Sequence, residues 1–458
     1  MPSRMSMRHH FNTAVLPGLV VLLALVLRLW YVLALPGQGG DLKFSDMWTY
    51  DYTARQLVRG LPVTGEPGLN GYHPLSASTY YYVGYTAFVA GVYALFGADP
   101  AAVRVVQAIV GAATVGVVYL IGSLALGRRA ALIAALLTAV YLPLVYYAGL
   151  LLSETWFIFL QMVSLALWLL VWRGQPVDAN CGRPTGDPAR LPLAVAAGFV
   201  AGLACLTRTA FVMGVAALAA GGLFVSPVPT TWKRRVIRAT AFVLAAAAAI
   251  APITIRNYQI HRRFILISTN GPSTFVTGHI THSSGLPPGG RRGETDVEMA
   301  DRHRSMAIQY LALHWRDYLA EIPEFFEIIW TDNDFWPSTS TYWLQNPGQP
   351  RADIQAHMTG SPPFGRSSYF PDLVRHVDRL VWCLIGLPMG ILAVLFLPRT
   401  HRRWSVLYLA ILPYLVVPFI AYAFSRYRLP AVPLFFLLAG QTLTTCWECR
   451  YHGSGKGD

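Results

Sequence analysis

The feature that most constrains this chain is a series of apolar runs, each long enough to cross a lipid bilayer as a helix of about 20 residues. Hydrophobic residues make up 54% of the 458 residues and charged residues only 13%, which is too apolar for a water-soluble domain of this length. The sequence therefore predicts an all-α polytopic membrane protein. We expect about ten transmembrane helices: Ala14–Leu35, Arg104–Leu126, Ala130–Tyr147, Thr155–Trp172, Leu193–Thr207, Ala210–Val225, Val236–Ile255, Leu380–Leu397, Trp404–Phe424 and Leu429–Cys446.

The cations predict how the chain is threaded. The formal net charge is +13, but the cations form short clusters between apolar runs and do not line one face, so we expect no nucleic-acid partner. If Thr79–Phe96 lies along the outer surface, the clusters at Arg128–Arg129, Lys233–Arg235 and Arg399–Arg403 all lie in the cytoplasm. If Thr79–Phe96 instead spans the membrane, all of these cationic clusters lie on the outer side. The positive-inside rule favours the first arrangement, in a multi-pass protein of the cell inner (plasma) membrane with both termini cytoplasmic.

Two large outer loops divide the chain. The first, residues 36–103, belongs to an N-terminal transmembrane module of residues 1–255, which we expect to be catalytic. The second, residues 256–379, is the only polar region long enough to form a small extracytoplasmic domain, and its Glu294–Glu327 tract is helix-like. The rest is expected to form the C-terminal transmembrane helices and a cytoplasmic tail, residues 380–446 and 447–458.

An acidic run follows the first apolar segment. Asp46 and Tyr50 have the spacing of one helical face, and Ser45 or Asp46 can cap a short helix there. Asp46 therefore suits a catalytic base, with Tyr50 beside the substrate, although a capping role alone would also explain Asp46. Asp41 and Asp51 lie off this face, and we expect them to be capping or solvated residues.

Isolated charges at the ends of apolar runs form a second pattern. With the threading above, they all emerge on the outer side: Glu154, Arg208, Arg256, Arg426 and Arg428. An ionisable residue at membrane depth is costly unless it is paired, so each is a functional candidate, while snorkelling to lipid headgroups is the alternative for each arginine. Arg28, inside the first apolar run, is expected to snorkel or pack.

A carboxylate that faces several cations suits transfer of a sugar from a polyprenyl phosphate. Phosphate is already a good leaving group, and cations stabilise the negative charge that grows on it. The acceptor hydroxyl is a poor nucleophile, so a carboxylate must take its proton. One base and a basic cradle are the minimal machinery for inverting transfer.

Cofactor signals are weak. No cofactor is certain and no metal ligands are assigned, although Asp46 with Glu154 could hold a divalent ion. Cys446 and Cys449 have the spacing of half a zinc site, but no second pair exists. Another set lacks metal-site spacing and is interpreted as scattered loop residues: His279, His282, Asp296, Asp301 and His303. Aromatic residues between Trp330 and Trp343 fit sugar stacking and interfacial anchoring equally well.

Several short motifs in order resemble the GT-C membrane glycosyltransferases related to protein O-mannosyltransferases and to the aminoarabinose transferase of lipid A, in particular the bacterial members of glycosyltransferase family 39. The motifs are Asp46–Gly60, Tyr72–Pro74, Tyr85–Gly97, Arg104–Gln107, Leu152–Glu154, Leu206–Arg208, Arg256–Tyr258, Ser268–Gly271 and Ser425–Pro430. The resemblance implies a GT-C-type bundle with outer juxtamembrane helices and a small extracytoplasmic domain. It also implies an active site on the extracytoplasmic (periplasmic) side.

The resemblance also implies residue roles. Asp46 matches the catalytic base, and Glu154 matches the second-loop acidic residue, which positions the acceptor or the substrate's cationic partners. The candidates for the lipid phosphate are Arg104, Arg208, Arg256, Arg426, Arg428 and His73.

The implied function is an integral-membrane hexosyl- or pentosyltransferase that uses a polyprenyl-phosphate-linked sugar and a lipid, glycan or protein acceptor. Met47 stands where protein O-mannosyltransferases have a second acidic residue, and their β-trefoil insert is absent, which favours a lipid or glycan acceptor. A transporter or flippase of lipid-linked sugars is the alternative, but it should carry charges in both halves of the bilayer. A third possible function is that of an assembly subunit whose active site has decayed.

Overall fold

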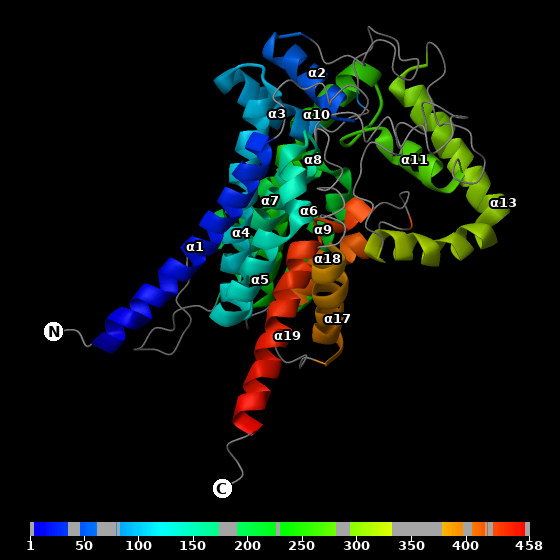
Figure 1. The fold of residues 1–458 in the computed structure, drawn as a ribbon. Coiled ribbons are helices and arrows are strands. Elements are labelled where there is room, and N and C mark those ends of the chain that lie inside the picture. The colour runs from blue at the N-terminus through cyan, green and yellow to red at the C-terminus, as the bar shows by residue number, and fades with distance from the viewer. Residues whose placement is uncertain are drawn as a thin grey trace, which may run out of the picture.

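The computed structural model describes residues 4–34, 46–61, 79, 83–173, 190–225, 230–280, 294–331, 378–396, 405–416, 419 and 425–453. Every regular element within these ranges is a helix, which confirms the predicted fold class (Figure 1). Five helices of this part of the chain are long and apolar enough to cross a membrane. They are α1 (Arg4–Ala34, apolar from Val15), α4 (Pro100–Ala125), α7 (Glu154–Val171), α8 (Arg190–Thr207) and α10 (Trp232–His261).

The other predicted spans are shorter or bent. The pair α5 (Arg128–Val140) and α6 (Leu142–Tyr146), continued by η2 (Tyr147–Gly149), makes a sixth span if its 57° bend is allowed. The remaining predicted spans coincide with short apolar helices and with α19, so the total of ten stays a prediction. These elements are η3 (Thr209–Phe211), α9 (Val212–Ala220), η4 (Gly221–Val225), η6 (Arg379–Gly386), α17 (Leu387–Phe396), α18 (Ser405–Val416) and α19 (Val432–Gly453).

Arg28 explains how the chain tolerates the break between α5 and α6. Pro143 has no N–H, so the carbonyl of Ala139, four residues earlier, lacks its helical donor. Arg28 supplies one from α1, because its Nη1 lies 3.2 Å from the Ala139 oxygen and its Nη2 lies 3.4 Å from that of Thr138. Gly111 leaves the room that this side chain occupies, since a Cβ there would lie 2.7 Å from Arg28 Nε. Arg28 is therefore a packing residue, the second of its two expected roles.

The described residues of the segment predicted to be the first outer loop include two short helices, α2 (Asp46–Val58) and α3 (Val83–Phe96), at one end of the bundle. The 14 residues of α3 extend about 21 Å, less than the roughly 30 Å of a bilayer core. This agrees with an interfacial Thr79–Phe96 stretch. The start of α1 and the end of α19 lie at the opposite end of the molecule (Figure 1). The helix that begins with Asp46 is thus separated from the start of α1 and from the end of α19 by the length of the bundle.

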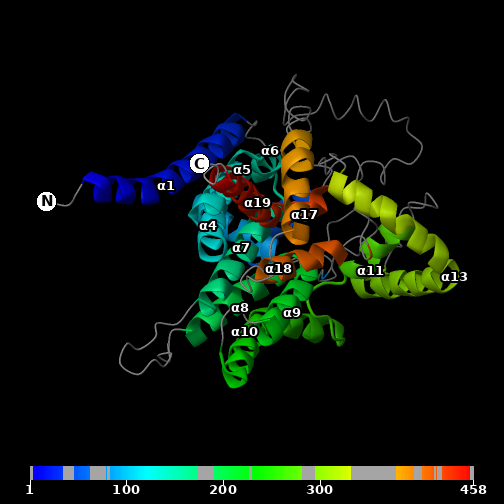
Figure 2. The same ribbon diagram turned by 90° about the horizontal axis from the view of Figure 1, so that it is seen from below.

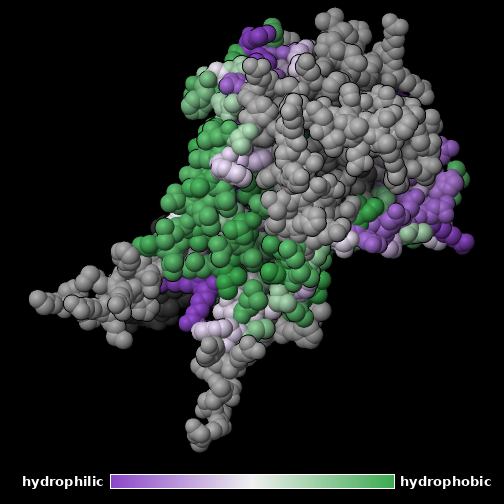
Figure 3. All heavy atoms as spheres, viewed as in Figure 1, coloured by the Kyte–Doolittle hydropathy of each residue, from purple (hydrophilic) through white to green (hydrophobic). Residues whose placement is uncertain are grey.

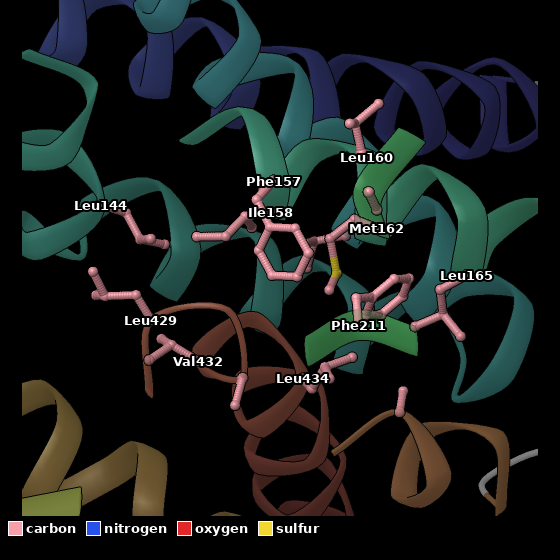
Figure 4. Close-up of a cluster of buried hydrophobic side chains, with 14 of the residues drawn as sticks. Leu144, Phe157, Ile158, Leu160, Met162, Leu165, Phe211, Leu429, Val432 and Leu434 are labelled. Carbon is pink, nitrogen blue, oxygen red and sulfur yellow. The ribbon is translucent and has the colours of Figure 1, made fainter. Parts of the chain in front are cut away.

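The surface and the interior follow the division expected of a membrane protein. A hydrophobic band covers the long helices in Figure 3, while the visible face of α13 (Asp296–Thr331) is mainly hydrophilic. Inside, side chains of α6, α7, η3 and the start of α19 form one cluster around Phe157 and Met162 (Figure 4). Lipid tails are as apolar as these side chains, so close packing, more than the hydrophobic effect, holds such helices together.

Two glycines bring α8 and α10 into backbone contact. Gly198 and Gly202 lie one turn apart on α8, in the small-xxx-small pattern of close membrane helix pairs. A Cβ at Gly198 would overlap the carbonyl oxygen of Phe242, and one at Gly202 would lie 2.6 Å from that of Ala246. Neither position can accept a larger side chain unless α10 moves.

The segment after α10, which is predicted to be extracytoplasmic and is called the outer segment below, contains α11 (Asn270–Phe275), η5 (Val276–Ile280) and α13. The helix predicted at Glu294–Glu327 is therefore confirmed, with non-helical angles at His314 that divide it into two limbs. Asp296, at its start, accepts a hydrogen bond from the backbone N–H of Thr79 at 2.7 Å, and the Thr79 carbonyl accepts one from Thr269 at 3.0 Å. The outer segment is thus attached to the residues just before α3. The three domain boundaries proposed from the sequence stay predictions.

The glycine contact on α8 is testable. Gly198→Val should lower the thermal stability of the detergent-purified protein, because overpacking of this kind costs about 1–3 kcal/mol. The matched control is Gly18→Val in α1, where a Cβ meets no atom within 4 Å. A thermal unfolding scan of both variants measures the difference, and equal midpoints would contradict backbone contact between α8 and α10.

Candidate active site

Asp46 is the first residue of α2, as predicted. The N-terminus of a helix favours a negative charge, which suits a carboxylate in this position. Tyr50 and Ala54, on the same helical face, are buried, whereas the Asp46 side chain is 41% exposed. Its Oδ2 lies 3.7 Å from Nη2 of Arg426, in η9 (Ser425–Arg428). The structure thus brings together a base candidate and a phosphate candidate that are 380 residues apart in sequence.

Asp51 corrects one expectation. It is neither solvated nor capping, because its carboxylate is buried and accepts hydrogen bonds from Arg55 Nε at 2.9 Å and from the Tyr93 hydroxyl. The ion pair with Arg55 lies within α2, whereas Tyr93 belongs to α3, so its hydrogen bond to Asp51 attaches α3 to the helix that carries Asp46. Asp41 lies outside the described residues.

Glu154 and Arg208 form a second ion pair. Glu154 begins α7, and Arg208 stands at the break between α8 and η3 in an extended conformation. Arg208 Nη2 lies 2.5 Å from Glu154 Oε1, and Arg208 Nε donates to Ser153 Oγ at 3.3 Å. The Glu154 side chain is 1% exposed, and its Oε2 has no hydrogen-bond partner among the described residues. Gly84 of α3 lies against the backbone of Thr207, which places α3 beside this break.

Tyr427 connects the two ion pairs. Its ring centroid lies 5.6 Å from the guanidinium carbon of Arg426 and 5.9 Å from that of Arg208. The Tyr147 hydroxyl, in η2, interacts electrostatically with Glu154, Arg208 and Arg426. We use the name site cluster for Asp46, Glu154, Arg208, Arg426 and Tyr427. Sequence reasoning missed both tyrosines, although Tyr427 stands between two of the predicted arginines.

Tyr50 and Arg104 adjoin the site cluster through Tyr85 of α3. The Tyr50 and Tyr85 rings meet edge to face at 4.7 Å, and the charges of Glu154 and Arg104 act on the Tyr85 hydroxyl. Burial, the largest cause, raises the pKa of Tyr85 well above its usual value. The phenol therefore stays protonated, and it donates to Gln107 Oε1 at 2.8 Å. Arg104 is buried in α4, close to this network.

Arg428 has different surroundings from Arg426. It is fully buried, lies 2.5 Å from Asp378 and donates to the carbonyl of Ile329 at 3.0 Å. The ring centroid of Trp382 lies 5.5 Å from its guanidinium carbon, and Tyr141 also donates to Asp378. These contacts connect the start of η6, the end of α13 and η9. They favour a structural role for Arg428 over the phosphate role that we expected.

Among the described residues, Arg256 makes no hydrogen bond or ion pair with the site cluster. Arg256, half-buried near the end of α10, donates to the neighbouring Asn257 Oδ1 at 3.2 Å, and Asn257 in turn donates to the Ile267 carbonyl at 3.0 Å. The role of Arg256 as a phosphate ligand stays a prediction. His73 lies outside the described residues.

The acidic and histidine side chains form no ready-made metal centre in the part of the chain that the structure describes, where no three His, Cys, Asp or Glu residues are placed to hold an ion. Asp46 and Glu154 each face an arginine. His303 Nδ1 lies 2.8 Å from Ser273 Oγ, and burial, with a smaller contribution from Arg302, lowers the His303 pKa to about 4. The imidazole is therefore neutral at neutral pH. His282 lies outside the described residues.

A family model described as dolichyl-phosphate-mannose-protein mannosyltransferase matches residues 83–255. This range contains Glu154 and Arg208, whereas Asp46 and Arg426 lie outside it. No curated protein matches the chain by sequence.

The fold is similar to that of two solved membrane enzymes. The oligosaccharyltransferase of Archaeoglobus fulgidus in its apo form aligns at a TM-score of 0.56 and 15% identity, over 98% of this chain and 52% of its own. ArnT from Cupriavidus metallidurans, bound to undecaprenyl phosphate, aligns at a TM-score of 0.52 and 15% identity, over 95% of this chain and 62% of its own. This chain spans about half the length of the archaeal enzyme. Its fold is that of the GT-C membrane glycosyltransferases.

Proposed function

We propose that this protein is an integral-membrane glycosyltransferase. It takes a sugar from a polyprenyl-phosphate carrier and transfers it, with inversion, to a lipid, glycan or protein acceptor. The observation that carries the proposal is the site cluster, in which the partly exposed Asp46 pairs with Arg426, and Tyr427 lies beside both Arg426 and Arg208. Support comes from the similar folds, since one structure of the archaeal enzyme is a complex with dolichol-phosphate and that of ArnT holds undecaprenyl phosphate.

The chemistry follows from the exposure of the groups. The acceptor hydroxyl attacks the anomeric carbon on the face opposite the phosphate, and the bond between that carbon and the phosphate oxygen breaks. Asp46 is the more accessible carboxylate, so we assign it to take the proton of the hydroxyl. Arg426 and Arg208 stabilise the negative charge that grows on the leaving phosphate. Arg104 and Arg256 are retained as further phosphate ligands, and Tyr50 as a substrate contact.

Glu154 has a different task from Asp46. Its Oε1 fixes Arg208, while its second carboxylate oxygen has no hydrogen-bond partner among the described residues. A buried carboxylate oxygen of this kind is a strong acceptor for a hydroxyl, because an unmade hydrogen bond at such a group is costly. We propose that Glu154 positions a hydroxyl of the donor sugar or of the acceptor, as well as Arg208.

We also propose that the site cluster lies on the extracytoplasmic side of the inner membrane. The cationic loops are the support, since they fall at the opposite ends of the spans from Asp46, Glu154 and Arg208. The donor's polyprenyl chain would remain in the bilayer, and α3 would lie at the headgroups.

The base assignment is tested by donor consumption. Wild type and Asp46→Asn are purified in lipid bilayers and given radiolabelled polyprenyl-phosphate sugars, with and without a chelator. The wild type should consume one donor, and Asp46→Asn should do so at least about 100-fold more slowly because no group takes the proton. Asp317→Asn, at a 71% exposed side chain, is the control. Equal rates for wild type and Asp46→Asn would exclude the base role. Tight donor binding without consumption by wild type would favour a transporter.

The two neighbouring arginines give a second test. Arg428→Met should lower the stability of the protein by about 3–5 kcal/mol, because Asp378 would be left as a buried, uncompensated charge. Arg426→Met removes a side chain whose ion pair with Asp46 is longer and partly exposed, so it should leave the unfolding midpoint nearly unchanged and weaken donor binding. Thermal unfolding and donor titration of both variants measure the change in stability and the change in donor affinity. A loss of stability with Arg426→Met alone would reverse the two roles.

The threading is tested by labelling. A single cysteine at Tyr427 should react in intact cells with a thiol reagent that cannot cross the membrane, whereas one at Lys233 should react only after permeabilisation. The reverse pattern would place the site cluster on the cytoplasmic side.

A further inference from the structure

The second limb of α13, from Trp315 to Thr331, is amphipathic, and the protein covers only part of its apolar face. At about 100° per residue, one face carries Trp315, Leu319, Ile322, Phe326 and Ile329. Ile322 and Ile329 are 7% and 1% exposed, whereas Trp315 and Leu319 are 52% and 51% exposed. The same apolar stripe is therefore inside the protein at one end and uncovered at the other.

The opposite face of this limb is polar. Glu324 follows Trp315 by nine residues, which places it about 180° around the helix. Glu324, Glu327 and Asp317 are exposed. A surface that covers Trp315 and Leu319 can therefore leave these acidic residues in water.

Contacts with the segment after α18 set the position of the uncovered end. The Tyr318 hydroxyl donates to the carbonyl of Phe419 at 2.8 Å, and the rings of Phe326 and Phe419 lie 6.1 Å apart. Phe419 follows the last residue of α18 by three positions and is 38% exposed. On α18 itself, Leu412 and Leu415 are 47% and 39% exposed. The limb is thus held beside the segment that follows a short apolar helix of the bundle, and both carry exposed apolar side chains.

The orientation of the limb agrees with these contacts. In Figures 1 and 2 the limb runs across the direction of the long helices. Helices that lie in the membrane interface have this orientation, with tryptophan and leucine directed to the lipid. The corner before the limb is also apolar and exposed, because Leu311 and Leu313 are 36% and 68% exposed.

We propose that the uncovered end of this limb docks on the lipid bilayer beside α18. Trp315 and Leu319 enter the interfacial region, with Leu313 at the corner, while Glu324 and Glu327 stay in water. Lipid is the occupant because Tyr318 and Phe326 hold the limb beside the segment after α18, an apolar helix that itself exposes leucines. A tryptophan beside Arg316 at 5.3 Å is also typical of a headgroup boundary. The bilayer then supports the outer segment at a second point, in addition to its attachment at Thr79.

The test uses the full-length protein in vesicles of phosphatidylcholine and phosphatidylglycerol. The five native cysteines are replaced by serine, and an environment-sensitive fluorophore is attached to Leu319→Cys, Trp315→Cys or the matched control Glu324→Cys on the opposite face. Phosphatidylcholine with a nitroxide near its headgroup should quench the probe at 319 and 315 at least about twofold more than at 324, because an interfacial helix buries its apolar face about 5–10 Å deep.

Each alternative result overturns the proposal. Equal quenching at 319 and 324 would mean that the limb has no preferred face toward lipid. A blue-shifted emission at 319 and 315 without nitroxide quenching would mean that a protein surface, such as a second copy of the chain, covers the stripe. The unfolding midpoint of each labelled protein shows whether it is folded, and the two apolar positions serve as independent tests.

Discussion

Pairing of ionisable groups at the end of a membrane bundle is the interaction on which this structure depends. A charge taken out of water costs several kcal/mol unless an opposite charge or hydrogen bonds compensate it. The chain meets this requirement with separate ion pairs: Asp46 with Arg426, Glu154 with Arg208, and Asp378 with Arg428. Each pair joins segments far apart in sequence. The same contacts that stabilise the charges therefore also join α2 to η9, α7 to the break after α8, and η9 to the start of η6.

Helix breaks make these pairs geometrically possible. Arg208 reaches Glu154 because α8 ends at Thr207 and the backbone becomes extended. The bend at Pro143 exposes carbonyl groups, which Arg28 satisfies. The turn of chain after that bend carries Tyr147, next to both ion pairs of the site cluster. Irregular backbone at such depth is tolerated only where other groups satisfy it, so the site lies where the helices are interrupted.

Much of the fold could be predicted from the chain alone, because long apolar runs leave few alternatives to transmembrane helices. Glu154, Arg208 and Arg426 were predicted as site residues because isolated charges at the ends of such runs stand out, and Asp46 because it stands at the start of a predicted helix. These roles stay predictions. The same reasoning could not predict which side chains these charged residues bind. Asp51 was expected in solvent, yet it binds Arg55 and Tyr93, and Arg426 and Arg428 share one motif but have different partners. Periodicity identifies a helix face, whereas long-range packing decides what that face meets.

The two ion pairs of the site cluster differ in a way that suits their proposed tasks. The Glu154–Arg208 pair is short and its carboxylate is almost completely buried, so separating it would leave a charge without compensation. The Asp46–Arg426 pair is 3.7 Å long and the Asp46 side chain is 41% exposed, so water or a ligand can replace either partner at little cost. An incoming phosphate can therefore take Arg426 from Asp46. In the proposed reaction, the Asp46 carboxylate would then be released from Arg426 and could accept the proton of the acceptor hydroxyl.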